Sequence, residues 1–235
     1  MDAGGSPIIL ALDTDDLNLA SRWIEATWES IDIYKVGLEF FLKFGVEGLQ
    51  ALHSFGDFEL FLDLKLHDIP NTVGGAVSSV RDLNPKFLTV HASGGSAMIK
   101  AAVTNGPNIL ITAVTVLTSL DEPELVKMGI GSSPLELAIS LATNSVLSGA
   151  RAIVCSPLEV GAIREAVGDH IVIITPGVRP LGSEIGDQNR VMTPQQALMA
   201  GANYLVIGRP ITSYFERSAE AMTVRAREIL ESIRQ

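Results

Sequence analysis

Eight short apolar runs, each followed by a segment of helical periodicity, constrain the fold of this 235-residue chain most strongly. Most of the runs are continuously apolar, which is typical of strands buried on both faces of a parallel sheet. The predicted strands are Ile8–Leu12, Ile33–Val36, Leu60–Leu64, Phe87–Val90, Ile109–Val114, Ala152–Val154, Ile171–Ile174 and Tyr204–Ile207. The predicted helices are Leu17–Ser30, Phe40–Ser54, Val73–Asp82, Ser96–Asn105, Leu135–Ser148, Leu158–Val167, Pro194–Ala200 and Ala219–Ile233.

Eight β-then-α units without a linker-like stretch predict an α/β fold, a closed (β/α)₈ TIM barrel, rather than an open doubly wound sheet. We expect residues 1–235 to form one such domain, because 47% of the residues are hydrophobic and only 19% are charged. Two connections are long, Leu117–Pro134 and Pro176–Thr193. Both follow strands, so they lie on the face where barrel enzymes place their sites, and loops of this length often act as lids.

Charge and cysteine content limit the partners and the compartment. The net charge of −10 argues against general binding to nucleic acid or to acidic membranes. Cys155 is the only cysteine, which excludes an internal disulfide. Residues 1–6 do not resemble a signal peptide, and no 18-residue apolar run predicts a membrane span. We therefore expect a cytoplasmic protein without a nucleic-acid or membrane partner.

Charged residues stand at or near the ends of the first three predicted strands: Asp13, Lys35, Asp63 and Lys65. Barrel interiors normally take branched apolar side chains, and burying ions costs free energy unless they are paired. Asp63 and Lys65 are two residues apart, so they project from the same strand face. Asp13 alone could be a helix cap, and Asp63 with Lys65 could be a structural ion pair. The four together favour a catalytic array.

Alternating ammonium and carboxylate groups suit one kind of chemistry. Each group keeps its neighbours ionised. Such an array can press a carboxylate against an anionic group of a substrate while it holds an ammonium ready as a proton donor. Two unit charges about 4 Å apart interact by roughly 4 kcal/mol at an effective dielectric near 20. An interaction of that size is worth about three powers of ten in rate.

Arginines follow the last two predicted strands, where barrel enzymes commonly bind phosphate. Arg179 closes the segment Thr175-Pro-Gly-Val-Arg179, and Arg209 follows Gly208, whose missing side chain lets a ligand approach the backbone. The chain has no HxH or HExxH motif, no cysteine cluster and no glycine-rich nucleotide loop. We therefore expect a phosphate site without a metal or a cofactor.

The segment Asp63-Leu-Lys65-Leu-His-Asp68-Ile-Pro-Asn-Thr72 resembles the signature of the orotidine 5′-phosphate decarboxylase family in its bacterial form. Thr175-Pro-Gly-Val-Arg179, Gly186-Asp-Gln188 and Ile207-Gly208-Arg209-Pro extend the resemblance toward the C-terminus. It implies a cofactor-free, metal-free lyase of pyrimidine biosynthesis that converts orotidine 5′-phosphate to UMP and CO₂. It also implies a homodimer with shared active sites.

The resemblance further implies a role for each matching position. Lys65 would donate a proton to C6 of the pyrimidine, and Asp63 would lie against the substrate carboxylate. Lys35 and Asp68 would complete the charge array, with Asp68 reaching in from the partner subunit. The remaining implied substrate contacts are Asp13 and Lys35 for ribose, Thr118 and Ser119 for the pyrimidine edge, Arg179, Gln188, Gly208 and Arg209 for the phosphate region, and Thr72 from across the dimer interface.

Two alternatives remain open. Sister barrel families, the 3-keto-gulonate 6-phosphate decarboxylases and the hexulose-phosphate synthases, share the Asp-x-Lys-x-x-Asp core but use Mg²⁺. A protein that binds a nucleotide phosphate and has lost turnover would keep the barrel. The complete four-ion array argues against this second alternative, because a binding protein has no use for buried charges.

Overall fold

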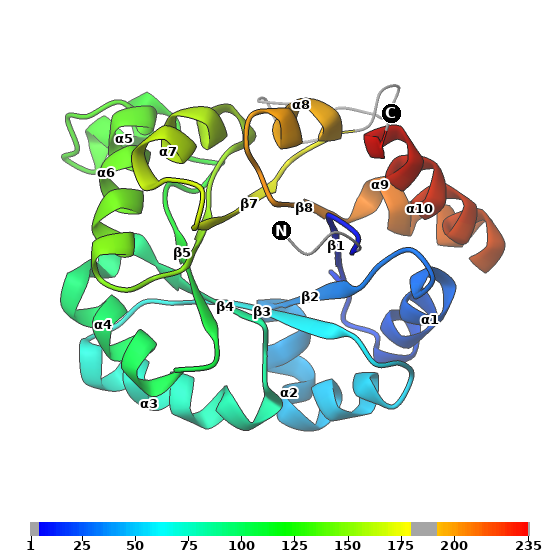
Figure 1. The fold of residues 1–235 in the computed structure, drawn as a ribbon. Helices are drawn as coiled ribbons and strands as arrows, with labels where there is room; N and C mark the ends of the chain where they lie inside the picture. The colour runs from blue at the N-terminus through cyan, green and yellow to red at the C-terminus, as the bar shows by residue number, and fades with distance from the viewer. Residues whose placement is uncertain (1–4, 180–191, 235) are drawn as a thin grey trace.

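The structure, a computed structural model, describes residues 5–179 and 192–234. Over these ranges, eight parallel strands pair in the order β1 to β8, and β1 also pairs with β8, so that the sheet closes into a barrel (Figure 1). The strands are β1 Ile8–Ala11, β2 Ile33–Gly37, β3 Glu59–Leu66, β4 Phe87–His91, β5 Leu110–Val114, β6 Ala152–Val154, β7 Val172–Pro176 and β8 Tyr204–Ile207. The predicted (β/α)₈ TIM barrel is therefore confirmed.

Helices surround the barrel (Figure 1). The α-helices are α1 Leu17–Thr27, α2 Leu38–His53, α3 Pro70–Val80, α4 Gly95–Asn105, α5 Glu122–Lys127, α6 Pro134–Leu147, α7 Val160–Val167, α8 Pro194–Met199, α9 Arg209–Thr212 and α10 Ala219–Arg234. Short 3₁₀ helices are η1 Arg81–Leu83, η2 Ala92–Gly94, η3 Pro157–Glu159 and η4 Ser213–Glu216. Over the described residues, none of the helices has the length and apolar character needed to cross a bilayer.

Within the described ranges, the structure adds two short α-helices to the helices predicted. Helix α5 lies in the first long connection, where the Asp121 carboxylate caps it by accepting a hydrogen bond from the Glu124 N–H at 3.0 Å. Helix α9 begins directly after Gly208. Both are too short to give a periodic apolar pattern. The second long connection passes through residues 180–191, so the lid expected there lies largely outside the described residues.

A small inner core closes the floor of the barrel. It consists of inward-facing strand residues, namely Ile9, Ile33, Phe61, Phe87, Ala152 and Ile174. The Phe87 ring contacts the Phe61 ring at 5.5 Å and the Tyr204 ring at 5.7 Å, in edge-to-face geometry. Because strand residues two apart share a face, the next inward layer on β1 to β4 is Ala11, Lys35, Asp63 and Thr89. The apolar floor therefore lies directly beneath the charged residues.

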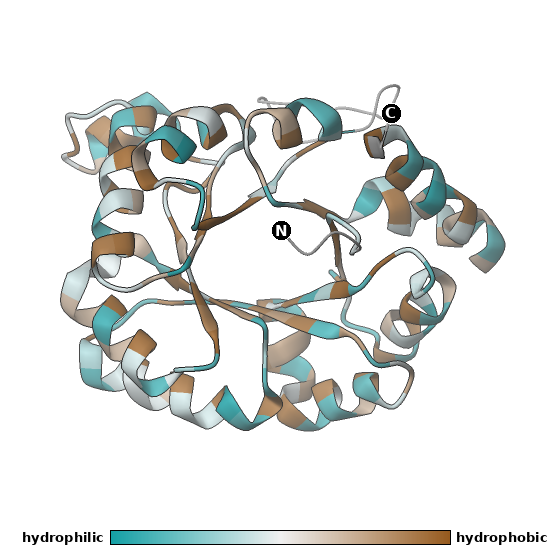
Figure 2. Ribbon diagram, viewed as in Figure 1, coloured by the Kyte–Doolittle hydropathy of each residue, from teal (hydrophilic) through white to brown (hydrophobic). Residues whose placement is uncertain are grey.

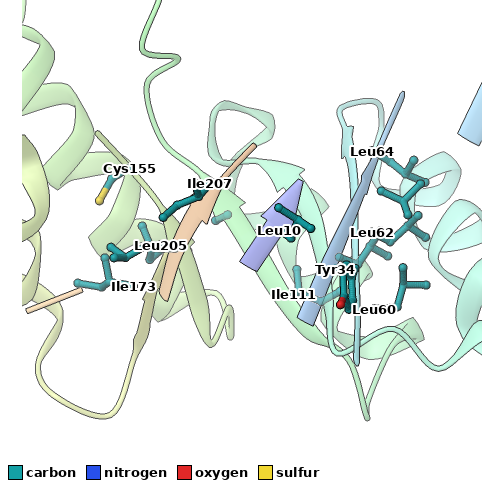
Figure 3. Close-up of a cluster of buried hydrophobic side chains, with 14 of the residues drawn as sticks. Leu10, Tyr34, Leu60, Leu62, Leu64, Ile111, Cys155, Ile173, Leu205 and Ile207 are labelled. Atoms are coloured by element: carbon teal, nitrogen blue, oxygen red, sulfur yellow. The ribbon is translucent and has the colours of Figure 1, made fainter. Parts of the chain in front are cut away.

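The larger core fills the space between the strands and the helices. Leu60, Leu62 and Leu64 alternate with Phe61 and Asp63 along β3, and Figure 3 shows these three leucines one above another on one side of the strand. The hydropathy colouring agrees, because brown segments dominate the strands while teal and brown alternate around the helices (Figure 2). Packing on both faces fixes the strands that carry the charged residues.

The inner core gives a test of stability. We expect Phe87→Ala to lower the free energy of unfolding by about 3–5 kcal/mol, because Phe87 is fully buried and its loss leaves a cavity. The matched control is Phe55→Ala, whose ring is 45% exposed and which should change stability by less than about 0.5 kcal/mol. Urea denaturation measures both, and equal losses for the two variants would contradict the assignment of the inner core.

Candidate active site

A cavity of about 300 Å³ opens at the carboxyl ends of the strands. Of the residues predicted for the site, eight line it: Asp13, Lys35, Asp63, Lys65, Thr118, Arg179, Gly208 and Arg209. Its other lining residues were not predicted as site residues, and they are Ala11, Phe61, Val114, Val116, Leu117, Val154, Cys155, Pro176, Gly177 and Val206. Several of these are inward-facing strand positions, which the period of two would have identified once the strand registers were known.

The four charged residues of β1 to β3 form one continuous row. Lys35 Nζ donates a hydrogen bond to Asp13 Oδ1 at 2.9 Å and lies 3.5 Å from Asp63 Oδ2. Lys65 Nζ donates to both oxygens of Asp63, at 2.8 and 2.9 Å. Lys35 and Asp63 are buried, with 9% and 8% of their surface exposed, while Lys65 is half-buried. The order of the row is Asp13–Lys35–Asp63–Lys65, with its exposed end at Asp13 and its half-buried end at Lys65.

The row keeps its buried members charged. Burial opposes the ammonium form of Lys35, but the carboxylates of Asp13 and Asp63 outweigh it, so the pKa of Lys35 lies above its ordinary value. Burial likewise opposes the ionised form of Asp63. The Lys35 and Lys65 ammonium groups, together with hydrogen bonds from Lys65 and Thr89, hold the pKa of Asp63 below its ordinary value. Near neutral pH, the centre of the row is a fixed carboxylate beside a fixed ammonium.

Asp13 is not the cap of the first helix. The residue that caps α1 is Asp16, whose side chain accepts a hydrogen bond from the Leu19 N–H at 3.0 Å. The ion pair of Asp13 with Lys35 lies beside the glycine at position 37. A Cβ atom there would lie 3.3 Å from Lys35 Nζ and 3.7 Å from Asp13 Oδ1. The glycine that ends β2 therefore leaves room for the pair.

The strand that carries Asp63 and Lys65 is irregular. The pairing of β3 with β4 shifts between Leu62 and Leu66, and Lys65 has a left-handed backbone with φ 49°. Thr89 on β4 bonds both residues, because its Oγ1 donates to Asp63 Oδ1 at 3.0 Å and accepts from Lys65 N at 2.8 Å. The two charged side chains do meet, as predicted, but at a bulged strand end rather than on a regular strand. Sequence reasoning did not single out Thr89, and the only signal was a polar residue among apolar ones.

Two arginines lie across the barrel from Lys65. Arg179 follows β7, which stands opposite β3 in the ring of strands, and Arg209 follows β8. The chain turns at Gly177, which has φ 80°, and the Arg179 N–H then donates to the Met192 carbonyl at 3.1 Å. Both arginines line the cavity with Gly208. The cavity therefore holds guanidinium groups after β7 and β8, across from Lys65, and the ion row on β1 to β3, an arrangement that suits an anionic ligand with a second polar end.

Three predicted site residues do not line the cavity of the single chain. Asp68, Thr72 and Ser119 are exposed, and Asp68 Oδ1 accepts a hydrogen bond from the Ile69 N–H at 2.6 Å. Gln188 lies outside the described residues. Within residues 5–179 and 192–234, no group of three or more His, Cys, Asp or Glu side chains is placed to hold a metal ion.

Comparison with known proteins identifies proteins that are similar to this chain over most of its length. An orotidine 5′-phosphate decarboxylase from Thermobifida fusca is 50% identical over 221 residues, which cover 94% of this chain and 95% of the relative. One from Frankia casuarinae is 42% identical, covering 95% of this chain and 88% of the relative. The crystal structure of orotidine 5′-phosphate decarboxylase from Lactobacillus acidophilus superposes with a TM-score of 0.81 at 33% identity, covering 96% of this chain and 99% of that one.

The family model extends this similarity over most of the sequence. It matches residues 6–224, which include the whole ion row and both arginines of the cavity. The chain belongs to the orotidine 5′-phosphate decarboxylase / HUMPS family.

Proposed function

We propose that this protein is a carboxy-lyase that converts orotidine 5′-phosphate to UMP and CO₂ in pyrimidine biosynthesis. The observation that carries the proposal is the ion row Asp13–Lys35–Asp63–Lys65, whose two central members are buried, in a cavity that also holds Arg179 and Arg209 across from Lys65. A cavity of about 300 Å³ is at the lower end of the range of small-molecule sites. The relatives that share 40–50% of the residues carry the same activity in their names.

The row accounts for the bond that breaks. In the proposed complex the substrate carboxylate lies beside Asp63, so a second negative charge meets a carboxylate that is already buried. Their repulsion raises the energy of the bound substrate and disappears as CO₂ leaves. The C6–carboxylate bond breaks, its electron pair stays on C6, and the adjacent ammonium of Lys65 stabilises the developing negative charge.

The same ammonium completes the reaction. Lys65 donates a proton from Nζ to C6, which forms the C6–H bond of UMP, and it regains a proton from solvent afterwards. Its two hydrogen bonds to Asp63 fix where Nζ lies before the substrate arrives. Lys35 does not face the reacting carbon in this scheme. It holds Asp63 ionised and binds ribose hydroxyls together with Asp13.

The arginines bind the phosphate at a distance from the reacting carbon. Arg179, Gly208 and Arg209 line the side of the cavity across from Lys65, and Gln188 is the proposed phosphate contact from the second long loop. Thr118, from the first long loop, is the proposed contact to the pyrimidine edge. Binding energy gained at the phosphate can then order the site and offset the repulsion at the carboxylate. The charge stabilisation comes from ammonium groups, so we propose a reaction that needs neither a metal nor a cofactor.

A homodimer would complete the site. Asp68 follows Lys65 by three residues, and among the described residues no ammonium of its own chain pairs with it. An apolar side chain is exposed next to it, since Ile69 is 65% exposed. A two-fold contact through this face would cover this side chain and bring Asp68 and Thr72 near the partner's cavity, while Ser119 would lie by the pyrimidine edge in its own chain. We further propose that the protein works in the cytoplasm on these small molecules, without a nucleic-acid or membrane partner.

The direct test is turnover with a chelator present. The purified protein should decarboxylate orotidine 5′-phosphate in excess EDTA, and in D₂O the UMP formed should carry deuterium at C6. Lys65→Ala should lower kcat by at least about three orders of magnitude, because the charge stabiliser and the acid are both lost. The control is Lys43→Ala, since Lys43 is an exposed lysine paired with Asp15. Activity that disappears with EDTA would favour the Mg²⁺-dependent sister enzymes, and UMP binding without turnover would favour a binding protein.

The phosphate contacts are tested by a pair of substrates. Arg209→Ala should lower kcat/KM for orotidine 5′-phosphate by at least about 100-fold, because charge-assisted hydrogen bonds worth about 3 kcal/mol are lost. Orotidine, which lacks the phosphate, should be a very poor substrate of the wild type, and Arg209→Ala should change its turnover little. A similar loss for both substrates would mean that Arg209 does not act on the phosphate.

Subunit exchange tests the shared site. Asp68→Ala and Lys65→Ala chains should each be inactive, but in a mixed dimer one site carries both lesions and the other carries neither. Random exchange makes about half of the dimers mixed, so roughly a quarter of the wild-type site activity should return. Tagged subunits that exchange yet stay inactive would show that Asp68 serves its own chain.

A further inference from the structure

The hydroxyl group of Thr89 joins the two charged residues of β3. Thr89 is on β4 and is fully buried. Its Oγ1 donates a hydrogen bond to Asp63 Oδ1 at 3.0 Å and accepts one from the Lys65 N–H at 2.8 Å. One side chain therefore holds the carboxylate of one residue and the backbone of the other, and its single hydroxyl proton and one of its lone pairs are both used.

The backbone of Lys65 needs such a partner. Between the paired positions Leu62↔Leu88 and Leu66↔Val90, β3 advances four residues while β4 advances two, so two residues of β3 are extra. Lys65 lies in this stretch with φ 49°, a left-handed conformation that is unfavourable for a residue with a Cβ atom. Because the β3–β4 pairing is interrupted there, the Lys65 N–H does not donate to a backbone carbonyl of β4 as it would in a regular sheet. The Thr89 hydroxyl supplies the acceptor in place of a backbone carbonyl.

We infer that Thr89 is a positioning residue of the proposed decarboxylation: its hydroxyl fixes the bulge from which Lys65 reaches Asp63, and so sets where the proton donor stands. The inference rests on the proposed function for its catalytic consequence. Thr89 is not one of the described residues that line the cavity, so it acts through Asp63 and Lys65 rather than on the substrate.

The position of the hydroxyl also explains why a threonine is tolerated in the barrel interior. Thr89 stands one layer above Phe87, between the apolar floor and the cavity. A buried hydroxyl without partners costs free energy, but here its proton goes to a carboxylate, where hydrogen bonds are stronger. The bond also contributes, after the two lysines, to the low pKa of Asp63. Valine would fill the same space without either bond.

Three substitutions isolate the hydroxyl. Thr89→Ala and Thr89→Ser both remove the methyl group, so the difference between them is the hydroxyl alone, and Thr89→Val removes the hydroxyl at nearly constant volume. The matched control is Thr112→Val. Thr112 pairs with Thr89 across β4 and β5 and is equally buried, but its hydroxyl donates to the Leu110 carbonyl of its own strand.

The positioning role predicts a split between chemistry and binding. Thr89→Ala and Thr89→Val should lower kcat about 10- to 100-fold and change the Kd for UMP by less than about threefold, because the arginines are untouched. Thr89→Ser and Thr112→Val should keep kcat within about threefold of the wild type. Hydrogen exchange at the Lys65 amide should be at least about tenfold faster in the Ala and Val variants and unchanged in the other two.

Three results would overturn the inference. The first is equal kcat values for Thr89→Ala and Thr89→Ser, and the second is a parallel loss of kcat and UMP affinity. The third is that Thr89→Ala and Thr89→Val fail to fold while Thr89→Ser folds, because the hydroxyl would then serve folding only. The exchange measurement needs no turnover. If the wild type fails to decarboxylate orotidine 5′-phosphate, the proposed function is refuted, and exchange at Lys65 still decides whether Thr89 holds its backbone.

Discussion

The buried contact of Lys35 with Asp63 is the constraint on which the rest of the site depends. Removing either partner would leave the other buried with a single oppositely charged neighbour, Asp13 for Lys35 or Lys65 for Asp63, which is more costly than losing an exposed ion pair. The register of β2 and β3 makes the contact possible. Lys35 is level with Phe61, and Gly37 is level with Asp63, so the long lysine side chain rises past a residue that has no side chain. The charged centre is thus fixed by strand pairing.

Charge and apolar packing divide the barrel into two zones. Phe61 and Phe87 close the floor with an edge-to-face contact, and the row of ions begins one layer above them. The floor keeps water from approaching the ions from below, which strengthens their attraction. Leucines on the outer side of β3 anchor the same strand to the helices (Figure 3). A site built on strands that are packed on both faces keeps its geometry before a ligand binds, as electrostatic catalysis requires.

The irregular end of β3 distinguishes this site from a structural ion pair on a regular strand. A regular strand would have placed Asp63 and Lys65 on one face without bringing the backbone of Lys65 into a left-handed conformation. The bulge re-aims the lysine, and Thr89 on the neighbouring strand satisfies the groups that the bulge frees. Backbone strain of this kind persists only where the surroundings hold it, and it is concentrated at functional sites.

The sequence by itself determined the barrel, the ion row and the arginines of the cavity, because apolar periodicity and ions at strand ends are local patterns. It did not reveal α5 or α9, which are too short to be periodic, nor the bulge at Lys65 and the role of Thr89. The bulge and the role of Thr89 depend on the register between β3 and β4, and the sequence of neither strand specifies that register. The tertiary structure alone decided that Asp16 rather than Asp13 caps α1 and that Asp68 does not line the cavity of its own chain. Each outcome depends on which groups the closed barrel brings close together.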